Sequence, residues 1–452
     1  MLIPKLTSSS IPTKSLTTPI VNKNEPVIDP DLPQSQSLTT FLVSRRVDLV
    51  LPDLPMFTDS SISDYNSLIY AKIGLCKEKC DFTRTNADLE AKAIKMSTLS
   101  ELSLMIETEF FFQFFTSNFF AECYNMLFQN IYRNISIDPS FITINGDSFS
   151  FLEPSWEHLS GVYEFANKLQ YISSYYNVIP KHILKLLIYL LDSPDYRERE
   201  SIFTLLYAYL KFHPMESNNI LKNLLYVLYE YIESPISFYS VQIVLRLLIA
   251  SREFNIDFLE KQYEIVSQII LLLSSSSLVV NYFTLLLSLF EVMITINRSF
   301  SYRVVHWLLK RFPVSSINHQ VINLMMLSKL YEYISIEQFD LLFDSFLFHY
   351  SMCAQSTSIK VIEESCKIWQ NNKMRPLIIR KSDKLISVLF PIIKNAIEKH
   401  WSTKAKPIGL SVFRVMREIN EKLFEQLHNK SIVQYDEPKK ITWELLSNIY
   451  VQ

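Results

Sequence analysis

Apolar residues recur at helical spacing through most of the chain, and short polar turns interrupt them. The segment Leu184–Phe212 shows the plan, because two apolar stretches flank a polar turn that contains Pro194. Proline ends the first helix, since it lacks an N–H group and its ring clashes with the preceding turn. Asp195 can then cap a second helix, and Glu198 lies three residues later, at the position of a capping box. The segment therefore predicts two helices joined by a short turn.

The same plan recurs along the chain. Similar turns are predicted near Pro235, Ser275, Pro313 and Gln355. A spacing of roughly 40 residues is typical of HEAT and armadillo repeats, in which helix pairs stack side by side. We therefore predict an all-α fold, an α-solenoid of roughly eight HEAT-like (pseudo-HEAT) helix pairs over residues 39–427.

The ends of the chain and one internal insert differ from this pattern. Residues 1–38 are rich in Ser, Thr and Pro, and such a stretch buries too little apolar surface to offset its ordering entropy, so a disordered tail is predicted. The segment Asn134–Glu153 is a polar insert. Residues 428–452 are predicted to form a polar tail in which 441–450 has the pattern of one short helix.

Composition excludes several classes of function. The 452 residues include only 4 glycines, and no two lie close enough for a phosphate-binding loop or a nucleophile elbow. The net charge of −2 is accompanied by no long basic run, so no nucleic-acid partner is expected. No residue pattern has the spacing of an active site. We therefore expect a protein that is not an enzyme, with no catalytic residue, no metal and no cofactor.

The cysteines and tryptophans have simpler interpretations than chemistry. The 5 cysteines are scattered, which is typical of reduced thiols inside a cell and favours the cytoplasm or nucleus. Cys76 and Cys80 would share a helix face, but no second pair completes a zinc site, so ordinary thiols are favoured. Four tryptophans along the repeats are interpreted as filler between helix layers: Trp156, Trp307, Trp369 and Trp401.

The stretch Ile269–Ile296 is long enough to cross a bilayer and carries a single charge, Glu291. The alternative is a pair of buried helices broken at Ser274–Ser277. We favour the helix pair, because Asn281 and Glu291 would be costly in lipid. Basic residues near this stretch are sparse, so they give no signal for the orientation of a membrane span.

Two arginines follow the predicted cap at Asp195. In a stacked repeat, an arginine just inside the second helix can bond the Asp of a neighbouring turn and so join one repeat to the next. The alternative is a solvated arginine that contributes very little to stability. We favour the structural role, for Arg199 more than for Arg197.

An ordered series of short sequence motifs, called words below, makes the chain resemble a known family. The clearest are Pro154–Leu159 and Val162–Phe165. Further words occur in the same order: Leu51–Pro55, Cys80–Phe82, Leu99–Glu101, Asp195 with Arg197–Arg199, Leu309–Pro313, Trp369–Asn371, Phe390–Pro391, His400–Trp401 and Met416–Phe424. Over roughly residues 50–427 the chain resembles the regulatory B-prime (56 kDa) subunits of protein phosphatase 2A, as a divergent member.

The resemblance implies a function. Members of this family are pseudo-HEAT solenoids without catalytic activity, which bind the scaffold and catalytic subunits of the phosphatase. They capture substrate proteins through short linear motifs, which raises the local substrate concentration in signal transduction. The alternative is an α-solenoid adaptor or transport carrier that is no longer tied to the phosphatase.

The resemblance also places the family's substrate groove. In the family, the helix after the Arg-Glu-Arg turn carries a His-Arg-x-Tyr run, and another arginine follows, so that arginines meet the carboxylates or phosphates of a bound peptide. In the ungapped register the matching positions are Tyr207, Ala208, Leu210 and Ser217. All four differ from the family pattern. Sliding the register by one residue restores no arginine and rotates the helix face by about 100°, so we expect a groove of altered chemistry.

Overall fold

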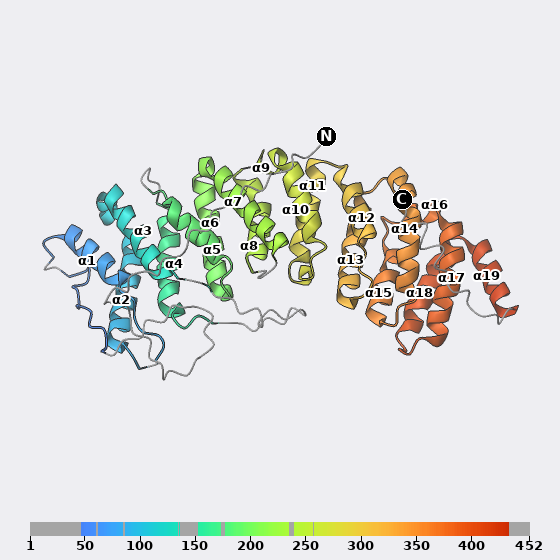
Figure 1. The fold of residues 1–452 in the computed structure, drawn as a ribbon, viewed down its shortest axis with the longest axis horizontal. Helices are drawn as coiled ribbons and strands as arrows, with labels where there is room; N and C mark the ends of the chain where they lie inside the picture. The colour runs from blue at the N-terminus through green and yellow to red at the C-terminus, as the bar shows by residue number, and fades with distance from the viewer. Residues whose placement is uncertain are drawn as a thin grey trace, which may run out of the picture.

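The protein is described here by a computed structural model that covers residues 47–59, 62–84, 86–133, 135, 152–172, 177–234, 239–255 and 257–433, with side chains to residue 429. Every regular element in these ranges is a helix. The helices lie side by side in chain order, from α1 at one end of an elongated molecule to α19 at the other (Figure 1). The predicted tail 1–38, residues 434–452 of the predicted C-terminal tail and most of the insert Asn134–Glu153 lie outside the described residues, whereas 428–433 belong to the last helix.

Successive helices alternate between two layers. The first-helix layer contains α1 (Tyr65–Lys77), α3 (Ser117–Ile131), α5 (Lys181–Leu190), α7 (Pro214–Glu233), α10 (Tyr263–Leu273), α12 (Phe300–Lys310), α14 (Ile336–Ala354) and α17 (Ser382–Lys399). The second-helix layer contains α2 (Leu89–Ile106), α4 (Trp156–Leu169), α6 (Tyr196–Phe212), α8 (Tyr239–Ala250), α11 (Phe283–Ile296), α13 (Ile317–Leu330), α15 (Ile359–Cys366) and α18 (Ala405–Ile419). Each first helix packs on its second helix, and each second helix packs on the next second helix.

The described residues also contain short 3-10 helices and three further α-helices: α9 (Asp257–Lys261), α16 (Arg375–Arg380) and α19 (Glu421–Val433). The last of them packs on α17 and α18 and follows the final pair. The eight pairs and their stacking confirm the predicted α-solenoid of HEAT-like helix pairs.

The predicted turns coincide with breaks between the helices of a pair. The turn at Pro194 separates α5 from α6, and Ser275, Pro313 and Gln355 each lie between the two helices of a later pair. The helix α7 ends at Glu233, two residues before Pro235, which lies outside the described residues. The polar residues that break the apolar pattern therefore mark the helix ends correctly.

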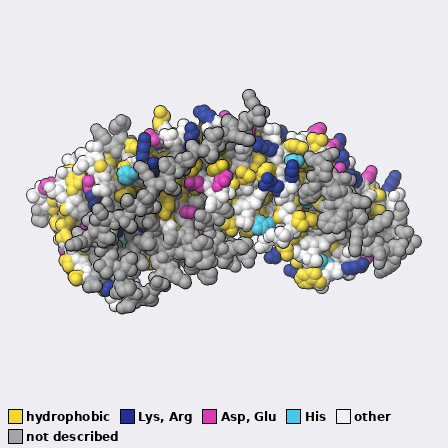
Figure 2. Space-filling model, viewed as in Figure 1, with side chains coloured by type: hydrophobic (Ala, Val, Ile, Leu, Met, Phe, Trp, Pro, Cys, Tyr) yellow, Lys and Arg dark blue, Asp and Glu magenta, His cyan; other side chains and the backbone are white. Residues whose placement is uncertain are grey.

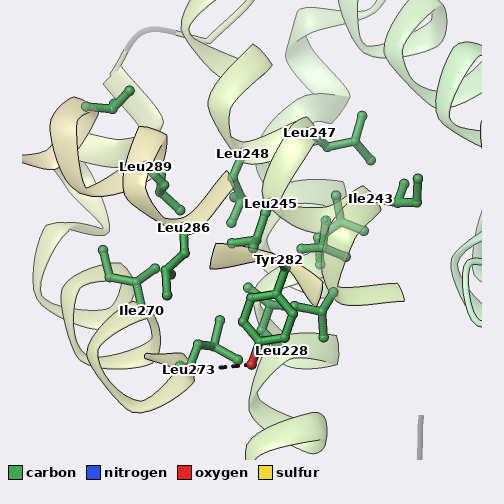
Figure 3. Packing of buried hydrophobic residues seen from close by; sticks show 14 of the residues in the cluster. Leu228, Ile243, Leu245, Leu247, Leu248, Ile270, Leu273, Tyr282, Leu286 and Leu289 are labelled. Carbon is green, nitrogen blue, oxygen red and sulfur yellow. Dashed lines mark hydrogen bonds between the residues drawn. The ribbon is translucent and has the colours of Figure 1, made fainter. Parts of the chain in front are cut away.

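The apolar stretch Ile269–Ile296 forms two helices, as favoured, with the break at Ser274–Ser277. Its side chains pack with those of α7 and α8 in the core shown in Figure 3. Tyr282 lies between the two helices, fully buried, and its hydroxyl donates to the Leu273 carbonyl at 3.2 Å. No helix in the part of the chain that the structure describes is both long and apolar enough for a membrane crossing.

Polar side chains also join several of the helix pairs to neighbouring elements. Their partners lie 37 to 46 residues away, which is the repeat spacing. These pairs are Arg246–Glu200, Arg303–Glu264, Lys373–Glu332, Arg380–Asp340, Lys384–Asp344 and Asn420–Asp383. Exposed pairs of this kind contribute about 0–1 kcal/mol each, so the apolar core supplies most of the stability.

The expectation for the tryptophans holds only in part. Trp369 is buried, and Trp156 and Trp307 are partly buried against the core. Trp401, however, is 75% exposed, and its indole Nε1 donates to the Thr357 carbonyl at 2.8 Å. Filler between layers is therefore the wrong interpretation for Trp401, which lies on the surface before α18.

The cysteines are buried, and none of them forms a disulfide. All five are reduced in the structure, and burial raises the pKa of Cys76 to about 12. Among the described residues no group of His, Cys, Asp and Glu side chains has the arrangement of a metal site. Cys76 and Cys80 belong to the core around α1.

Truncation of the central core tests the fold. Leu245 of α8 is fully buried between neighbouring helices, so Leu245→Ala is expected to destabilise the protein by about 2–5 kcal/mol. Leu341→Ala is the matched control, because Leu341 is 76% exposed and its truncation should cost less than about 0.5 kcal/mol. Urea unfolding followed by circular dichroism measures both, and equal shifts of the two midpoints would contradict this core.

Candidate protein-interaction surface

The turn between α5 and α6 is built around a buried carboxylate. Asp195 is fully buried and caps α6, accepting a hydrogen bond from the Arg197 N–H at 2.9 Å. It also accepts from the Arg197 guanidinium at 2.7 Å and from the Glu153 N–H at 2.8 Å. Burial alone would raise the pKa of Asp195, but these hydrogen bonds outweigh burial, and the pKa is lowered. The turn is thus joined to the segment that leads into α4.

Glu198 has a different role from the one its spacing predicts. Its carboxylate forms an ion pair with Arg133 and accepts a hydrogen bond from the Tyr163 hydroxyl at 2.8 Å. All three side chains are buried. The capping-box interpretation is therefore wrong for Glu198, because two buried partners from other elements hold its carboxylate. Sequence spacing shows only local partners, and these two lie 65 and 35 residues away.

The two arginines of the turn contact helices on either side. The Arg197 guanidinium lies 4.8 Å from the ring centroid of Trp156, in the preceding pair. The Arg199 guanidinium donates to the Ser193 carbonyl at 2.5 Å and lies 4.5 Å from the ring centroid of Tyr239, in the following pair. Burial lowers the pKa of Arg199. Both arginines thus contact a neighbouring pair through an aromatic ring.

An aspartate does join this turn to the next pair, but through the backbone. Asp192 accepts a hydrogen bond from the Ser240 N–H at 3.0 Å, near the start of α8. Asp192, two residues after the end of α5, thereby holds the first turn of α8 in place. The predicted arginine–aspartate contact between repeats is wrong: Arg199 donates to the Ser193 carbonyl, and the aspartate that joins the two pairs accepts from a main-chain N–H.

The four positions that match the family's groove are mostly buried. Ala208 and Leu210 lie in the core. Ser217 is fully buried, donates to the Pro214 carbonyl at 2.6 Å and accepts from Asn255 at 2.8 Å. Tyr207 is half-buried, and its hydroxyl donates to the Glu253 carboxylate. Of the four, Tyr207 is therefore the position that reaches the surface.

Tyr207 belongs to a surface formed by α6 and α8 together. We call this the α6–α8 surface, and it comprises Glu200, Phe203, Tyr207, Lys211, Arg246, Glu253 and Phe254. The Arg246 guanidinium lies 3.9 Å from the Phe203 ring centroid and forms an ion pair with Glu200. Acidic, basic and aromatic groups are thus paired across the boundary between two repeats.

Sequence reasoning did not find Arg246 or Glu253, because each lies 46 residues from its partner on α6. The repeat spacing is the signal that could have paired Arg246 with Glu200 and Glu253 with Tyr207.

Lys and Arg side chains are interspersed with acidic and apolar ones on the described part of the face in Figure 2. A peptide on the α6–α8 surface would have to exchange partners with the Arg246–Glu200 pair. Such a surface can bind a protein segment by charge and aromatic contact.

Comparison with known proteins decides the family. The model of the protein phosphatase 2A regulatory B subunit (B56 family) matches residues 54–449. The chain belongs to the B56 family. The resemblance expected from the short words is therefore confirmed, and the Asp195 turn and the α6–α8 surface are features of a B56 protein.

Named relatives of this B56 chain come from animals and plants. The mouse 56 kDa regulatory subunit alpha isoform of serine/threonine-protein phosphatase 2A is 23% identical over 391 residues, covering 84% of this chain and 79% of the relative. The B' delta isoform from Arabidopsis thaliana, a 55 kDa regulatory subunit of the same phosphatase, is 25% identical, covering 82% and 80%. The Caenorhabditis elegans regulatory subunit pptr-1 is 25% identical, covering 82% and 69%.

The buried ion pair at Glu198 gives a stability prediction. Glu198→Gln keeps the side-chain shape but leaves Arg133 buried without its counter-charge, which is expected to cost about 3–5 kcal/mol. Glu200→Gln, two residues away on the exposed face, should cost less than about 1 kcal/mol. Urea midpoints of the two variants are compared. An equal effect would show that Glu198 is not the anchor of this turn.

Burial of His158, which lies in the motif Pro154–Leu159, predicts how the stability of the fold depends on pH. His158 is buried, its ring packs edge-on to Phe82 at 4.9 Å, and its Nε2 lies 3.2 Å from the Lys92 carbonyl. Burial, followed by the charge of Lys95, lowers the pKa of His158 to about 3. The unfolded chain has a histidine pKa of about 6.5, so below that pH it takes up a proton that the folded state excludes.

Stability is therefore expected to fall as the pH drops from about 6.5 toward 3, and His158→Gln should remove part of this loss. Between pH 7 and pH 5 the difference between wild type and variant should change by about 1–2 kcal/mol. The matched control is His182→Gln, because His182 is exposed. Urea titrations at both pH values provide the measurement, and parallel curves for wild type and His158→Gln would contradict the assignment.

Proposed function

We propose that this protein is a non-catalytic regulatory subunit of a protein phosphatase 2A holoenzyme. It binds the scaffold and catalytic subunits and directs the choice of substrate. The family match over residues 54–449 carries this proposal. The relatives are named as regulatory subunits of that phosphatase, and the stacked helix pairs supply the long surface that such a role needs.

The adaptor or transport carrier is the less supported role. A family match that leaves out only the first 53 residues and the last three indicates that the whole solenoid descends from a phosphatase subunit. We also place the role in the cytoplasm or nucleus, because five buried cysteines without a disulfide suit a reducing compartment.

Substrate choice is assigned to the α6–α8 surface, with chemistry altered from the family pattern. Three of the four matching positions are buried, so they support this surface from beneath and do not contact a peptide. Tyr207, Arg246 and Lys211 remain as the groups that can meet one. An arginine placed at Ala208 or Ser217 would have to enter the core, which makes these positions unsuitable for rebuilding the family groove.

Co-purification tests the proposal. The tagged chain is expressed in its own cell type, isolated at low salt, and the bound proteins are identified by mass spectrometry. Scaffold and catalytic subunits are expected in about equal amounts with the chain, and the eluate should hydrolyse a phosphopeptide. An unrelated α-solenoid with the same tag is the negative control.

A double variant separates assembly with the phosphatase from the substrate surface. Tyr207→Ala with Arg246→Ala changes the α6–α8 surface alone, so it should still retain both phosphatase subunits while losing substrate proteins that the wild type retains. If neither of these subunits co-purifies with a wild-type chain that is folded by circular dichroism, the regulatory role is wrong.

A further inference from the structure

A groove lies on the other layer of the solenoid, between α5 and α7. Two adjoining cavities of about 480 and 450 Å³ form it, and they share Asp192, Tyr226, Val227, Glu230 and Ser240. The floor and walls are unusually rich in tyrosine, with Tyr189 and Tyr229 in addition to Tyr226. The α6–α8 surface belongs to the second-helix layer, whereas this groove is lined mainly by α5 and α7 of the first-helix layer and reaches only Ser240 at the start of α8. The two sites are therefore separate.

Tyr231 of the groove is buried, but the other three tyrosines are exposed to a degree that folding alone does not require. Tyr189, Tyr226 and Tyr229 are 47%, 60% and 49% exposed. Tyr189 is held in place by its hydroxyl, which accepts from the Ile135 N–H at 3.0 Å. Neighbouring exposed aromatic residues mark binding surfaces more often than isolated ones do.

Carboxylates accompany the tyrosines at helical spacing. Tyr226 and Glu230 lie four residues apart on α7, and Tyr229 and Glu233 repeat the spacing one step further on, so each ring lies beside a carboxylate on the same face. Glu230 and Glu233 are exposed. The nearby charge of Glu233 raises the pKa of Tyr229. These groups also lie in the last turns of α7, where the helix dipole favours a cation.

Elsewhere in the fold, a carboxylate and an aromatic ring on the same helix bind a Lys or Arg side chain. On α6, Glu200 and Phe203 hold the guanidinium of Arg246, which comes from the next helix pair. On α14, Asp340 and Phe343 hold the ammonium of Lys381 in the same way, at 3.0 Å from the carboxylate and 5.5 Å from the ring centroid. A carboxylate and an aromatic ring one helical turn apart thus bind a cation from a neighbouring element.

On α7 no cation from the described part of the chain takes this place beside the tyrosine–glutamate pairs. Among the described residues, no Lys or Arg forms an ion pair with Glu230 or Glu233 or lies over the ring of Tyr226 or Tyr229. The next helix of the layer, α10, packs on α7 and contains neither Lys nor Arg. Lys185 of α5 lines one side of the groove. Asp192 is half-buried and accepts from Ser240.

We propose that the groove between α5 and α7 binds a short arginine-bearing segment of a partner protein. The guanidinium lies over the rings of Tyr226 and Tyr229 and pairs with Glu230 and Glu233. Arginine is preferred to lysine because its planar group stacks on aromatic rings and pairs with carboxylates in two-point fashion. The site is additional to the proposed phosphatase role, and a segment bound here leaves the α6–α8 surface open.

Peptide binding tests the site in the full-length chain. The probe is a fluorescein-labelled Gly-Arg-Gly-Arg-Gly peptide, and fluorescence polarisation at low salt measures its affinity. The double variant Tyr226→Ala, Tyr229→Ala and the double variant Glu230→Gln, Glu233→Gln are each expected to bind it at least about tenfold more weakly. All four side chains are exposed, and circular dichroism confirms that the variants are folded.

Two matched controls remove the same kinds of side chain elsewhere. Tyr196 and Glu260 are exposed outside the groove, so Tyr196→Ala and Glu260→Gln should bind the peptide within about twofold of the wild type. A peptide with citrulline in place of arginine keeps the shape without the charge and should lose the same affinity as the groove variants do.

Three outcomes overturn the proposal. The first is unchanged binding by both groove variants, and the second is an equal loss in Glu260→Gln, which would indicate non-specific attraction. The third is equal affinity for a lysine peptide, which would contradict the arginine assignment. Co-purification of the phosphatase subunits is measured separately, so failure of this site leaves that proposal untouched, and the reverse also holds.

Discussion

Contact between the apolar faces of successive helix pairs holds the whole solenoid together. A single pair cannot bury both of its faces, so each needs the next, and the stack continues from α1 to α18 with α19 packed on its end. The core around Leu245 and Tyr282 shows the result, because its side chains come from α7, α8, α10 and α11 together (Figure 3). Stability is therefore shared between neighbours, and surface chemistry is free to vary.

Buried polar groups decide how one pair is placed on the next. Asp195 and Glu198 are both buried in the same turn, and each is satisfied by partners from other elements. A buried ion pair gives little net stability, but the loss of one partner is costly. The turn therefore fixes the position of α6 between α4 and α8, and so fixes the α6–α8 surface.

The same local device serves both structure and binding. A carboxylate beside an aromatic ring on one helix holds a cation from the next element at α6 and at α14. At α7 the chain repeats the pairing on an exposed face, where the next helix brings apolar residues. At α6 and α14 the neighbouring element supplies a cation, whereas α10 supplies none to α7. The same pairing that links repeats elsewhere is therefore a candidate binding site at α7.

The helices, their turns and the repeat could be predicted from the amino-acid sequence, because helical periodicity and proline or serine breaks act within a few residues. The amino-acid sequence also contains the short motifs that resemble the B56 family and the four positions that match the family's groove. Only the tertiary structure decided that Glu198 bonds Arg133 in place of capping α6, that Ser217 is buried and that Tyr207 is partly exposed. Burial and pairing at these residues are set by partners about one repeat or more away, which local spacing does not encode.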